Sequence, residues 1–257
     1  MREAAQHLYF LSCLAAGRLL RGARYSKAEI VEVDGQRHVR KHRRFYAPLL
    51  VWAGEPLVRV LNTGNRILTQ REWEQREREL YQRLYNTSIR VDPGGALVLP
   101  FLEGETLASL LENPSISDSV RETAIDLAVK ALAAIHELGL THGDAMAENV
   151  MIDLDSRAAH WFDFETIHDR DRPLAWRRSD DVRALLATSL ARTGPGKLAG
   201  TLHLILDAYG DETVTGLVAA SFGAIVQRPL TFHLGQAGLS FRYYREIERL
   251  LATRGSV

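Results

Sequence analysis

Residues 140–165 read LTHGDAMAENVMIDLDSRAAHWFDFE and carry three polar side chains at informative intervals. Asn149 follows Asp144 by five positions, and Asp163 follows Asn149 by fourteen. The apolar run between the last two predicts a strand, so a loop followed by a hairpin would bring all three side chains to one edge. Phosphoryl transfer from a nucleotide requires a carboxylate near the accepting hydroxyl and oxygen ligands for Mg²⁺, which an Asn and a second Asp can supply. This segment is therefore the candidate site.

The composition is that of an ordinary globular protein. The chain has 257 residues, 46% of them hydrophobic and 25% charged, which is enough for one large or two small domains. Its 32 basic and 32 acidic residues balance, so the net charge gives no reason to expect nucleic acid as a partner. The single cysteine, Cys13, excludes a disulfide within the chain and argues against a cysteine-based metal site. Such cysteine usage fits a reducing, cytoplasmic location.

Residues 3–20 form the first helical candidate, because apolar residues recur at helical spacing until Gly22. The apolar part, Leu8 to Gly17, is as long as a signal-peptide core but lacks a clear cleavage site, so we interpret it as a mature helix. No apolar run in the sequence reaches the roughly 18 residues of a membrane span. Two interpretations stay open: a helix that packs against the body of the protein, or an amphipathic helix that contacts the inner face of a membrane.

Strands dominate the next part of the chain. Ala28–Val33 and Arg37–Lys41 flank Asp34-Gly35, which is a typical hairpin turn. Further short strands are predicted at Leu57–Leu61, Ile67–Leu68 and Ala96–Leu102.

Residues 71–85 predict a charged helix with one apolar stripe. Glu77 falls on this stripe, four positions after Trp73 and four before Tyr81. An unpaired carboxylate among apolar side chains is costly, so Glu77 needs a cationic partner, and Lys41 is the candidate. Glu74 and Glu79 compete with Glu77 for this pairing, and the stripe favours Glu77.

The chain becomes mostly helical after residue 103. The predicted helices are Thr106–Leu111, Ser117–Leu138, Ser179–Ala191, Lys197–Tyr209, 211–226 and 237–252. Nucleotide pockets commonly lie in the cleft between two such parts of a protein.

Together, these features resemble the protein-kinase-like superfamily over most of residues 22–190. The resemblance implies an α+β, bilobal fold: a small β-rich lobe at 22–102 and a larger helical lobe at 103–257, preceded by an extra helix at 1–21. It also implies a hinge at Pro100, Phe101 and Leu102 that contacts ATP.

The matching motifs carry roles for individual residues. His142-Gly143-Asp144 with Asn149 looks like the kinase catalytic loop, and Asp163-Phe164-Glu165 stands where that family has its metal-binding Asp-Phe-Gly. The roles implied are: catalytic base, Asp144; Mg²⁺ ligands, Asn149 and Asp163; contact with the ATP phosphates, Lys41 with Glu77 as its partner; support of the loop, His142 and Asp181.

Three departures narrow the family. No Gly-x-Gly-x-x-Gly loop is present, and Gly22 to Lys27 occupies its place with one glycine. Only eighteen positions separate Asp163 from Asp181, which leaves no room for a long activation segment. Glu165 replaces a flexible glycine and adds a carboxylate beside the metal position.

This compact form is similar to two atypical groups of kinases. One comprises the bacterial kinases of lipopolysaccharide core sugars (Kdo and heptose kinases), and the other is the small kinase of the KEOPS complex. Trp176 to Leu185 and Phe222 to Leu230 look more like the first group.

The first hypothesis is accordingly an ATP- and Mg²⁺-dependent kinase that phosphorylates a hydroxyl of a lipopolysaccharide-core or other lipid-linked sugar. A protein Ser/Thr kinase or ATPase that acts in a complex is an alternative, and a nucleotide-binding pseudokinase scaffold is another. The sequence leaves the acceptor open. The arginines of residues 166–178 could hold an anionic substrate or could be solvated surface residues.

Overall fold

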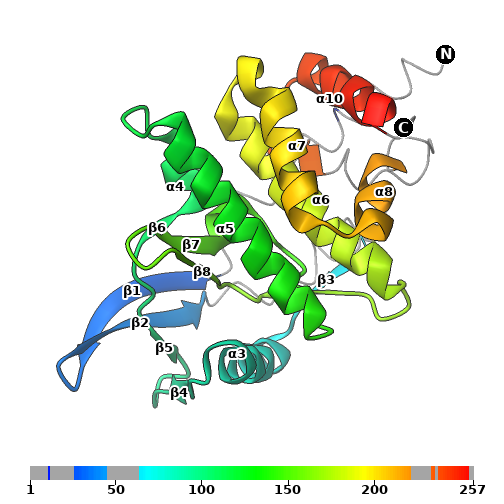
Figure 1. Ribbon diagram of the computed structural model, residues 1–257. Coiled ribbons are helices and arrows are strands. Elements are labelled where there is room, and N and C mark those ends of the chain that lie inside the picture. Colours follow the sequence, from blue (N-terminus) through cyan, green and yellow to red (C-terminus); the bar gives the residue numbers. More distant parts are fainter. Residues whose placement is uncertain (1–10, 12–25, 45–63, 221–232, 235–236, 255–257) are drawn as a thin grey trace.

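The computed structural model describes residues 11, 26–44, 64–220, 233–234 and 237–254. Within these ranges the chain is α+β, as the sequence predicts (Figure 1). The strands are β1 (Ser26–Val33), β2 (Gln36–Arg43), β3 (Asn65–Ile67), β4 (Arg90–Val91), β5 (Leu97–Pro100), β6 (Glu105–Thr106), β7 (Val150–Asp153), β8 (Ala158–Trp161) and β9 (Thr166–His168). The helices are α3 (Gln70–Tyr85), α4 (Leu107–Glu112), α5 (Asp118–Glu137), α6 (Leu174–Thr193), α7 (Leu198–Tyr209), α8 (Glu212–Ala220) and α10 (Phe241–Arg254), with 3-10 turns η1 (Ala147–Asn149) and η2 (Pro195–Lys197).

The hairpin predicted at Asp34-Gly35 forms one side of a four-stranded antiparallel sheet. Both turn residues have positive φ, 54° for Asp34 and 74° for Gly35, as a two-residue hairpin turn requires. The strand order is β1-β2-β5-β4, and the register places Lys41 between Ala28 on β1 and Leu97 on β5. Residues that pair in this way point to the same face of a sheet, so Lys41 shares its face with Leu97.

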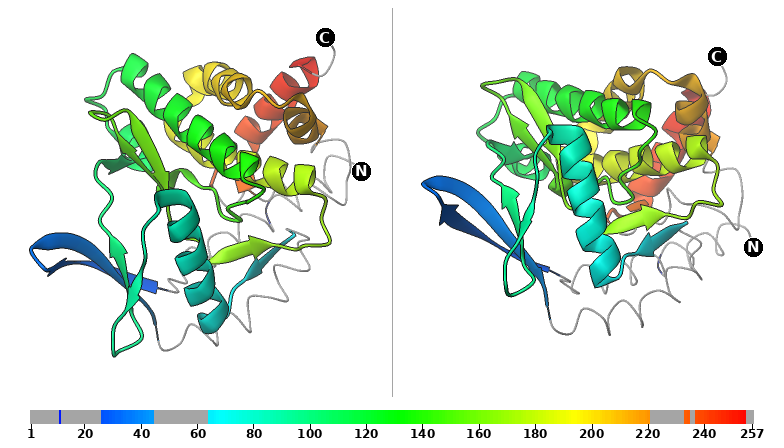
Figure 2. Two further views of the ribbon diagram at one scale, coloured as in Figure 1. Left: turned by 60° about the horizontal axis from the view of Figure 1, so that its bottom comes forward. Right: turned by 90° about the horizontal axis from the view of Figure 1, so that it is seen from below.

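Helix α3 confirms the stripe read from the sequence. The Glu72 carboxylate accepts hydrogen bonds from the Thr69 backbone N–H at 2.9 Å and from its hydroxyl at 2.7 Å, so the first turn is capped. The buried side chains are Trp73, Glu77, Leu80 and Tyr81. Figure 2 shows α3 between the four-stranded sheet and the β3–β9 pair.

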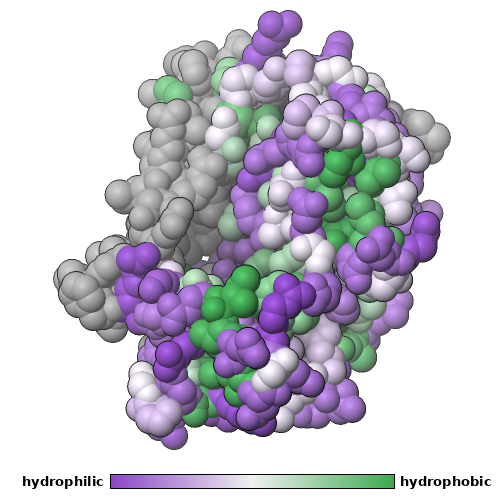
Figure 3. Space-filling model, turned by 90° about the vertical axis from the view of Figure 1, so that its left-hand side faces the viewer, coloured by the Kyte–Doolittle hydropathy of each residue, from purple (hydrophilic) through white to green (hydrophobic). Residues whose placement is uncertain are grey.

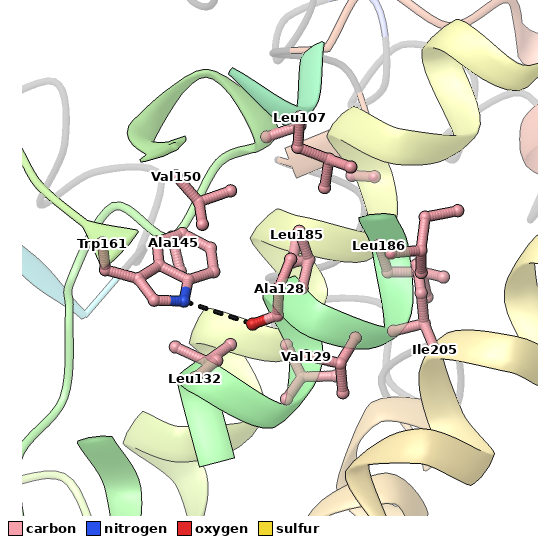
Figure 4. Close-up of a cluster of buried hydrophobic side chains, with 14 of the residues drawn as sticks. Leu107, Ala128, Val129, Leu132, Ala145, Val150, Trp161, Leu185, Leu186 and Ile205 are labelled. Atoms are coloured by element: carbon pink, nitrogen blue, oxygen red, sulfur yellow. Dashed lines mark hydrogen bonds between the residues drawn. The ribbon is translucent and has the colours of Figure 1, made fainter. Parts of the chain in front are cut away.

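The core of the helical part lies between α5, α6, α7 and the β7–β8 hairpin (Figure 4). Trp161 of β8 is 1% exposed, and its indole N–H donates to the Ala128 carbonyl of α5 at 3.2 Å. Leu132 of α5 and Leu185 of α6 are fully buried beside it. Each such side chain contributes about 1.5–3 kcal/mol by leaving water, so this core holds the hairpin after Asn149 in place.

Two helix starts differ from the sequence prediction by more than one residue. Helix α6 begins at Leu174, five positions before Ser179, because Pro173 precedes its first turn and Arg177 and Arg178 interrupt the apolar pattern without ending the helix. Helix α10 begins at Phe241 rather than at 237.

Several predicted features lie outside the described residues. They are the helix at 1–21, except Leu11, which is in a helix, the strand Leu57–Leu61, the first part of the turn at 22–27, and the segment Phe222 to Leu230. Among the residues that the structure describes, no helix combines the length and the apolar character needed to cross a membrane.

Gly104→Ala should destabilise the protein more than Gly210→Ala. Both glycines have positive φ (106° and 76°), so alanine costs about 1–2 kcal/mol at either position. Only at Gly104 would the added Cβ meet rigid backbone, 2.1 Å from the Ile152 carbonyl oxygen of β7, whereas at Gly210 nothing lies within 4 Å. The collision should add about 1–3 kcal/mol. Denaturant unfolding of both variants measures the difference, and equal losses would show that β7 does not require this close approach.

Candidate active site

The interval between Asp144 and Asn149 closes a tight turn. Asn149 ends the short turn η1, and its side-chain amide donates to the Asp144 backbone carbonyl at 2.8 Å and to the Asp144 carboxylate at 3.2 Å. The Nδ2 atom of Asn149 is thereby committed to Asp144. Its Oδ1 atom remains the acceptor that could face a cation.

Lys41 of β2 contacts two distant parts of the chain, α3 and the segment 163–165. Its ammonium lies 3.1 Å from Glu77 Oε1 on α3 and 3.1 Å from Glu165 Oε1, and it also forms an ion pair with Asp163. Asp163 has φ 68°, which is uncommon for a residue other than glycine, and such backbone conformations cluster at functional sites. The structure therefore brings Lys41, Glu77 and Asp163 together, as expected from the sequence.

Glu77 is the glutamate of α3 that reaches Lys41. It is fully buried, and its Oε1 atom also accepts a hydrogen bond from the Trp73 indole at 3.1 Å. Glu74 instead accepts from Gln70, and Glu79 lies 3.7 Å from Arg83. The apolar stripe of the helix thus identified the right residue among three.

The loop that carries Asp144 is supported by Asp181 of α6. The Asp181 carboxylate accepts the backbone N–H groups of His142 at 2.7 Å and Gly143 at 2.8 Å, and it lies 3.0 Å from His136 Nε2. His142 is buried, and its Nε2 lies 2.9 Å from the Phe162 carbonyl. Burial lowers the pKa of His142 to about 4, so its ring is neutral at pH 7 and supports the loop without charge.

Neighbouring carboxylates act on the ionisation of Asp144. Burial, followed by the negative charges of Asp163 and Glu148, raises the pKa of Asp144 to about 8. Burial would also raise the pKa of Asp163, but the Lys41 ammonium outweighs that effect and lowers it. A cation bound beside Asp144 would oppose the rise in the pKa of Asp144 and favour the ionised carboxylate.

The donor set fits magnesium held partly by phosphate. Among the residues described, no group of three or more His, Cys, Asp or Glu side chains could hold a metal alone. Mg²⁺ is usually bound by one or two carboxylates together with substrate phosphates and water. Asp163 and the free oxygen of Asn149 would supply the protein share of such a shell.

The expected hinge follows β5 directly. Pro100 ends that strand, and Phe101 and Leu102 are half-buried. The Arg37 guanidinium lies 4.2 Å above the Phe101 ring and 2.5 Å from Glu103, so β2 is tied to this connection.

Two arginines of residues 166–178 have roles within the fold. Arg172 stacks on the Trp176 ring at 5.1 Å, and Arg178 donates to the His136 carbonyl at 2.5 Å. These contacts favour a structural role for Arg172 and Arg178 over substrate binding.

Sequence reasoning missed a second buried aspartate beside the site. Asp180 lies 3.0 Å from His233 Nε2 and 3.3 Å from both His168 Nε2 and Asn65 Nδ2. Burial opposes its ionisation, but the surrounding His233 and His168 hold the pKa of Asp180 well below its usual range. In the sequence, Asp180 is marked only by standing next to Asp181. Its hydrogen-bond partners lie 12 to 115 positions away, and no sequence pattern identifies them.

Comparison with known proteins finds neither a family model that matches this chain nor a similar sequence among curated proteins.

Proposed function

We propose that this chain is a phosphotransferase with a bilobal, protein-kinase-like architecture, which transfers the γ-phosphate of ATP to a hydroxyl group with the help of Mg²⁺. One observation carries the proposal: Lys41 contacts both Glu77 and Asp163, which lie 36 and 122 positions further along the chain. Asp144 and Asn149 form the adjacent hydrogen-bonded pair. The small lobe would comprise residues 22–102 and the large lobe residues 103–257.

The Lys41 face of the sheet carries a row of apolar side chains against which a purine could rest. One row of paired residues across β1, β2 and β5 consists of Ile30, Val39 and Leu99. Val39 lies two positions from Lys41 on β2, so this row is on the same face of the sheet as Lys41. Ile30 is 64% exposed and Leu99 is 5% exposed, so Ile30 is the member of this row that is open to a ligand. Figure 3 shows hydrophobic surface among hydrophilic side chains on the side where the β1–β2 hairpin projects. A base resting on this row would point its phosphates toward Lys41 and reach the hinge at Pro100 to Leu102.

Each residue then has a defined part in the transfer. The hydroxyl oxygen of the acceptor forms a bond to the γ-phosphorus while the bond from that phosphorus to the bridging oxygen breaks, which releases ADP. Asp144 orients the hydroxyl and accepts its proton, and Lys41 holds the α- and β-phosphates. Magnesium, held by Asn149 and Asp163, would neutralise charge on the phosphate oxygens.

We assign the acceptor hydroxyl to a sugar, in a lipopolysaccharide core or another lipid-linked glycan. The short segment between Asp163 and Asp181 supports this assignment. Its first residues pair as β9 with β3, and its last residues already belong to α6, so little chain remains to hold an extended peptide acceptor. We place the reaction in the cytoplasm, where ATP is supplied, and residues 3–20 would provide any contact with the membrane.

Label transfer from γ-³²P-ATP tests the function. Purified protein with Mg²⁺ is incubated in parallel with lipopolysaccharide-core glycolipid, with a protein extract, and in buffer alone. Label in the glycolipid that disappears with Asp163→Ala is the expected result. Label in protein alone would replace the sugar by a protein acceptor, release to water alone would indicate an ATPase, and no transfer in any arm would contradict the proposal.

A further inference from the structure

Arg76 of α3 contacts the loop that carries Asp144. Its Nη2 atom donates to the backbone carbonyls of Thr141 at 2.7 Å and His142 at 3.2 Å. The next residue along the helix, Glu77, holds Lys41. Adjacent positions of one helix therefore reach the lysine proposed to bind phosphate and the loop proposed to bind the acceptor hydroxyl.

Two more side chains from the same region hold this loop. Arg83 of α3 donates to the Leu138 carbonyl at 3.1 Å, and Asn65 of β3 donates to the Gly143 carbonyl at 2.9 Å. Asp181 holds the amides of His142 and Gly143 from α6. The backbone of residues 138–143 is thus held through its carbonyls by residues 65–83 and through its amides by α6.

Neighbouring contacts fix α3 in the same place. Strand β3, which precedes α3, pairs with strand β9, which follows Glu165. The Leu68 N–H extends this pairing by donating to the Glu165 carbonyl at 3.1 Å. Figure 2 shows α3 beside this pair in both views. A swing of α3 away from the loop would have to break the pairing and the arginine contacts together.

We propose that Arg76 is a positioning residue, which fixes the Lys41–Glu77 pair relative to Asp144 through the Thr141 and His142 carbonyls. This role rests on the proposed function. The guanidinium suits it because its fixed fork of donors can satisfy more than one carbonyl, whereas a lysine ammonium on a flexible stem does so with less defined geometry. Burial lowers the pKa of Arg76, yet an arginine stays charged at neutral pH, so its hydrogen bonds to the carbonyls are charge-assisted.

If Arg76 has this role, its replacement should lower kcat while the affinity for the nucleotide stays nearly unchanged. Lys41 and Glu77 both belong to the N-terminal part of the chain, so if Arg76 were lost Glu77 would still hold Lys41, and Lys41 would still bind the ATP phosphates. Their placement relative to Asp144 would loosen, and a misplacement of about 1 Å can cost 10²-fold in rate. Arg76→Met should therefore lower the Mg²⁺-dependent turnover of ATP about 10- to 100-fold, with the Kd for MgATP changed less than about threefold.

The experiment combines turnover, calorimetric MgATP binding and hydrogen exchange of backbone amides. Arg76→Met is compared with Arg76→Lys, which should retain part of the rate, and with Arg71→Met, an exposed arginine on the first turn of the same helix. Faster exchange at residues 141–144 in Arg76→Met, with unchanged exchange in α5, is expected. Unchanged exchange and unchanged kcat would overturn the proposed role, as would a loss of MgATP binding equal to the loss of kcat.

The two proposals can fail separately. If the unaltered protein binds no MgATP and turns over none, the proposed function is overturned. Faster exchange at 141–144 in Arg76→Met but not in Arg71→Met would still support the contact between α3 and the loop, because exchange does not depend on catalysis.

Discussion

Replacement of Asp144 by asparagine should lower the rate of phosphoryl transfer about 10³-fold, because positioned general bases contribute roughly 10²–10⁴-fold. In the unaltered protein, the Asn149 amide donates to the Asp144 carboxylate at 3.2 Å. Asparagine at position 144 has the same shape and can still accept this hydrogen bond through its side-chain oxygen. It cannot accept the proton of the acceptor hydroxyl. The loss should therefore appear in kcat, with little change in the affinity for MgATP.

The same replacement should make the metal-free protein more stable at pH 8. The pKa of Asp144 is raised from 3.8 to about 8, by burial first and then by Asp163 and Glu148. A carboxyl group whose pKa is higher in the folded than in the unfolded protein stabilises the fold most below its unfolded-state pKa, here about 4. This stability is lost as the pH rises toward the folded-state pKa. Asparagine has no such loss, so its advantage should grow between pH 5 and pH 8.

Thermal unfolding in EDTA, combined with rate measurements in Mg²⁺, checks both effects. Asp155→Asn, on the exposed turn between β7 and β8, is the matched control and should change neither quantity. An Asp144→Asn protein that keeps its full rate would remove Asp144 from the mechanism. One that unfolds at lower temperature at pH 8 would contradict the electrostatic description of the site.

Lys41→Met should destabilise the protein by about 3–5 kcal/mol, because it leaves buried carboxylates without their cation. Lys41 is 6% exposed and Glu77 is fully buried, so water cannot replace the lost partner. The carboxylate of Glu165, 3.1 Å from the ammonium, loses the same cation. Phosphoryl transfer should also fall strongly, because the phosphate contact is removed.

The double variant Lys41→Met/Glu77→Gln separates the charge effect from lost packing. Glutamine keeps the acceptor for the Trp73 indole but carries no charge, so the second replacement should recover about 1–3 kcal/mol of the loss. Lys27→Met, whose ion pair with Glu29 is more than one-third exposed on both sides, should change the free energy of unfolding very little. Additive effects of the Lys41 and Glu77 replacements would show that the ion pair is not the source of the loss.

The sequence predicted features that have a local signal. Asp34-Gly35 marked the hairpin because two positive φ angles in succession restrict the residue types. The stripe of α3 selected Glu77, because a carboxylate among apolar positions must be buried and paired. The intervals from Asp144 to Asn149 and from Asn149 to Asp163 marked the loop and the hairpin that follows it.

The contacts around that loop had no comparable signal. Arg76 and Asn65 bind backbone carbonyls, and every residue has a carbonyl, so no residue type marks the partner. Asp180 depends on His168 and His233, which the fold brings to it from other elements. The start of α6 was missed for a related reason, since Arg178 interrupts an apolar pattern while its guanidinium binds the His136 carbonyl.

Calorimetric titration of ATP into the protein, with and without Mg²⁺, tests the central claim most directly because it does not depend on the acceptor. We expect Mg²⁺ to strengthen ATP binding in the unaltered protein and in the control Asp155→Ala, and this Mg²⁺ effect to be lost in Asp163→Ala. Failure to bind ATP, or the same Mg²⁺ effect in Asp163→Ala as in the unaltered protein, would contradict the claim.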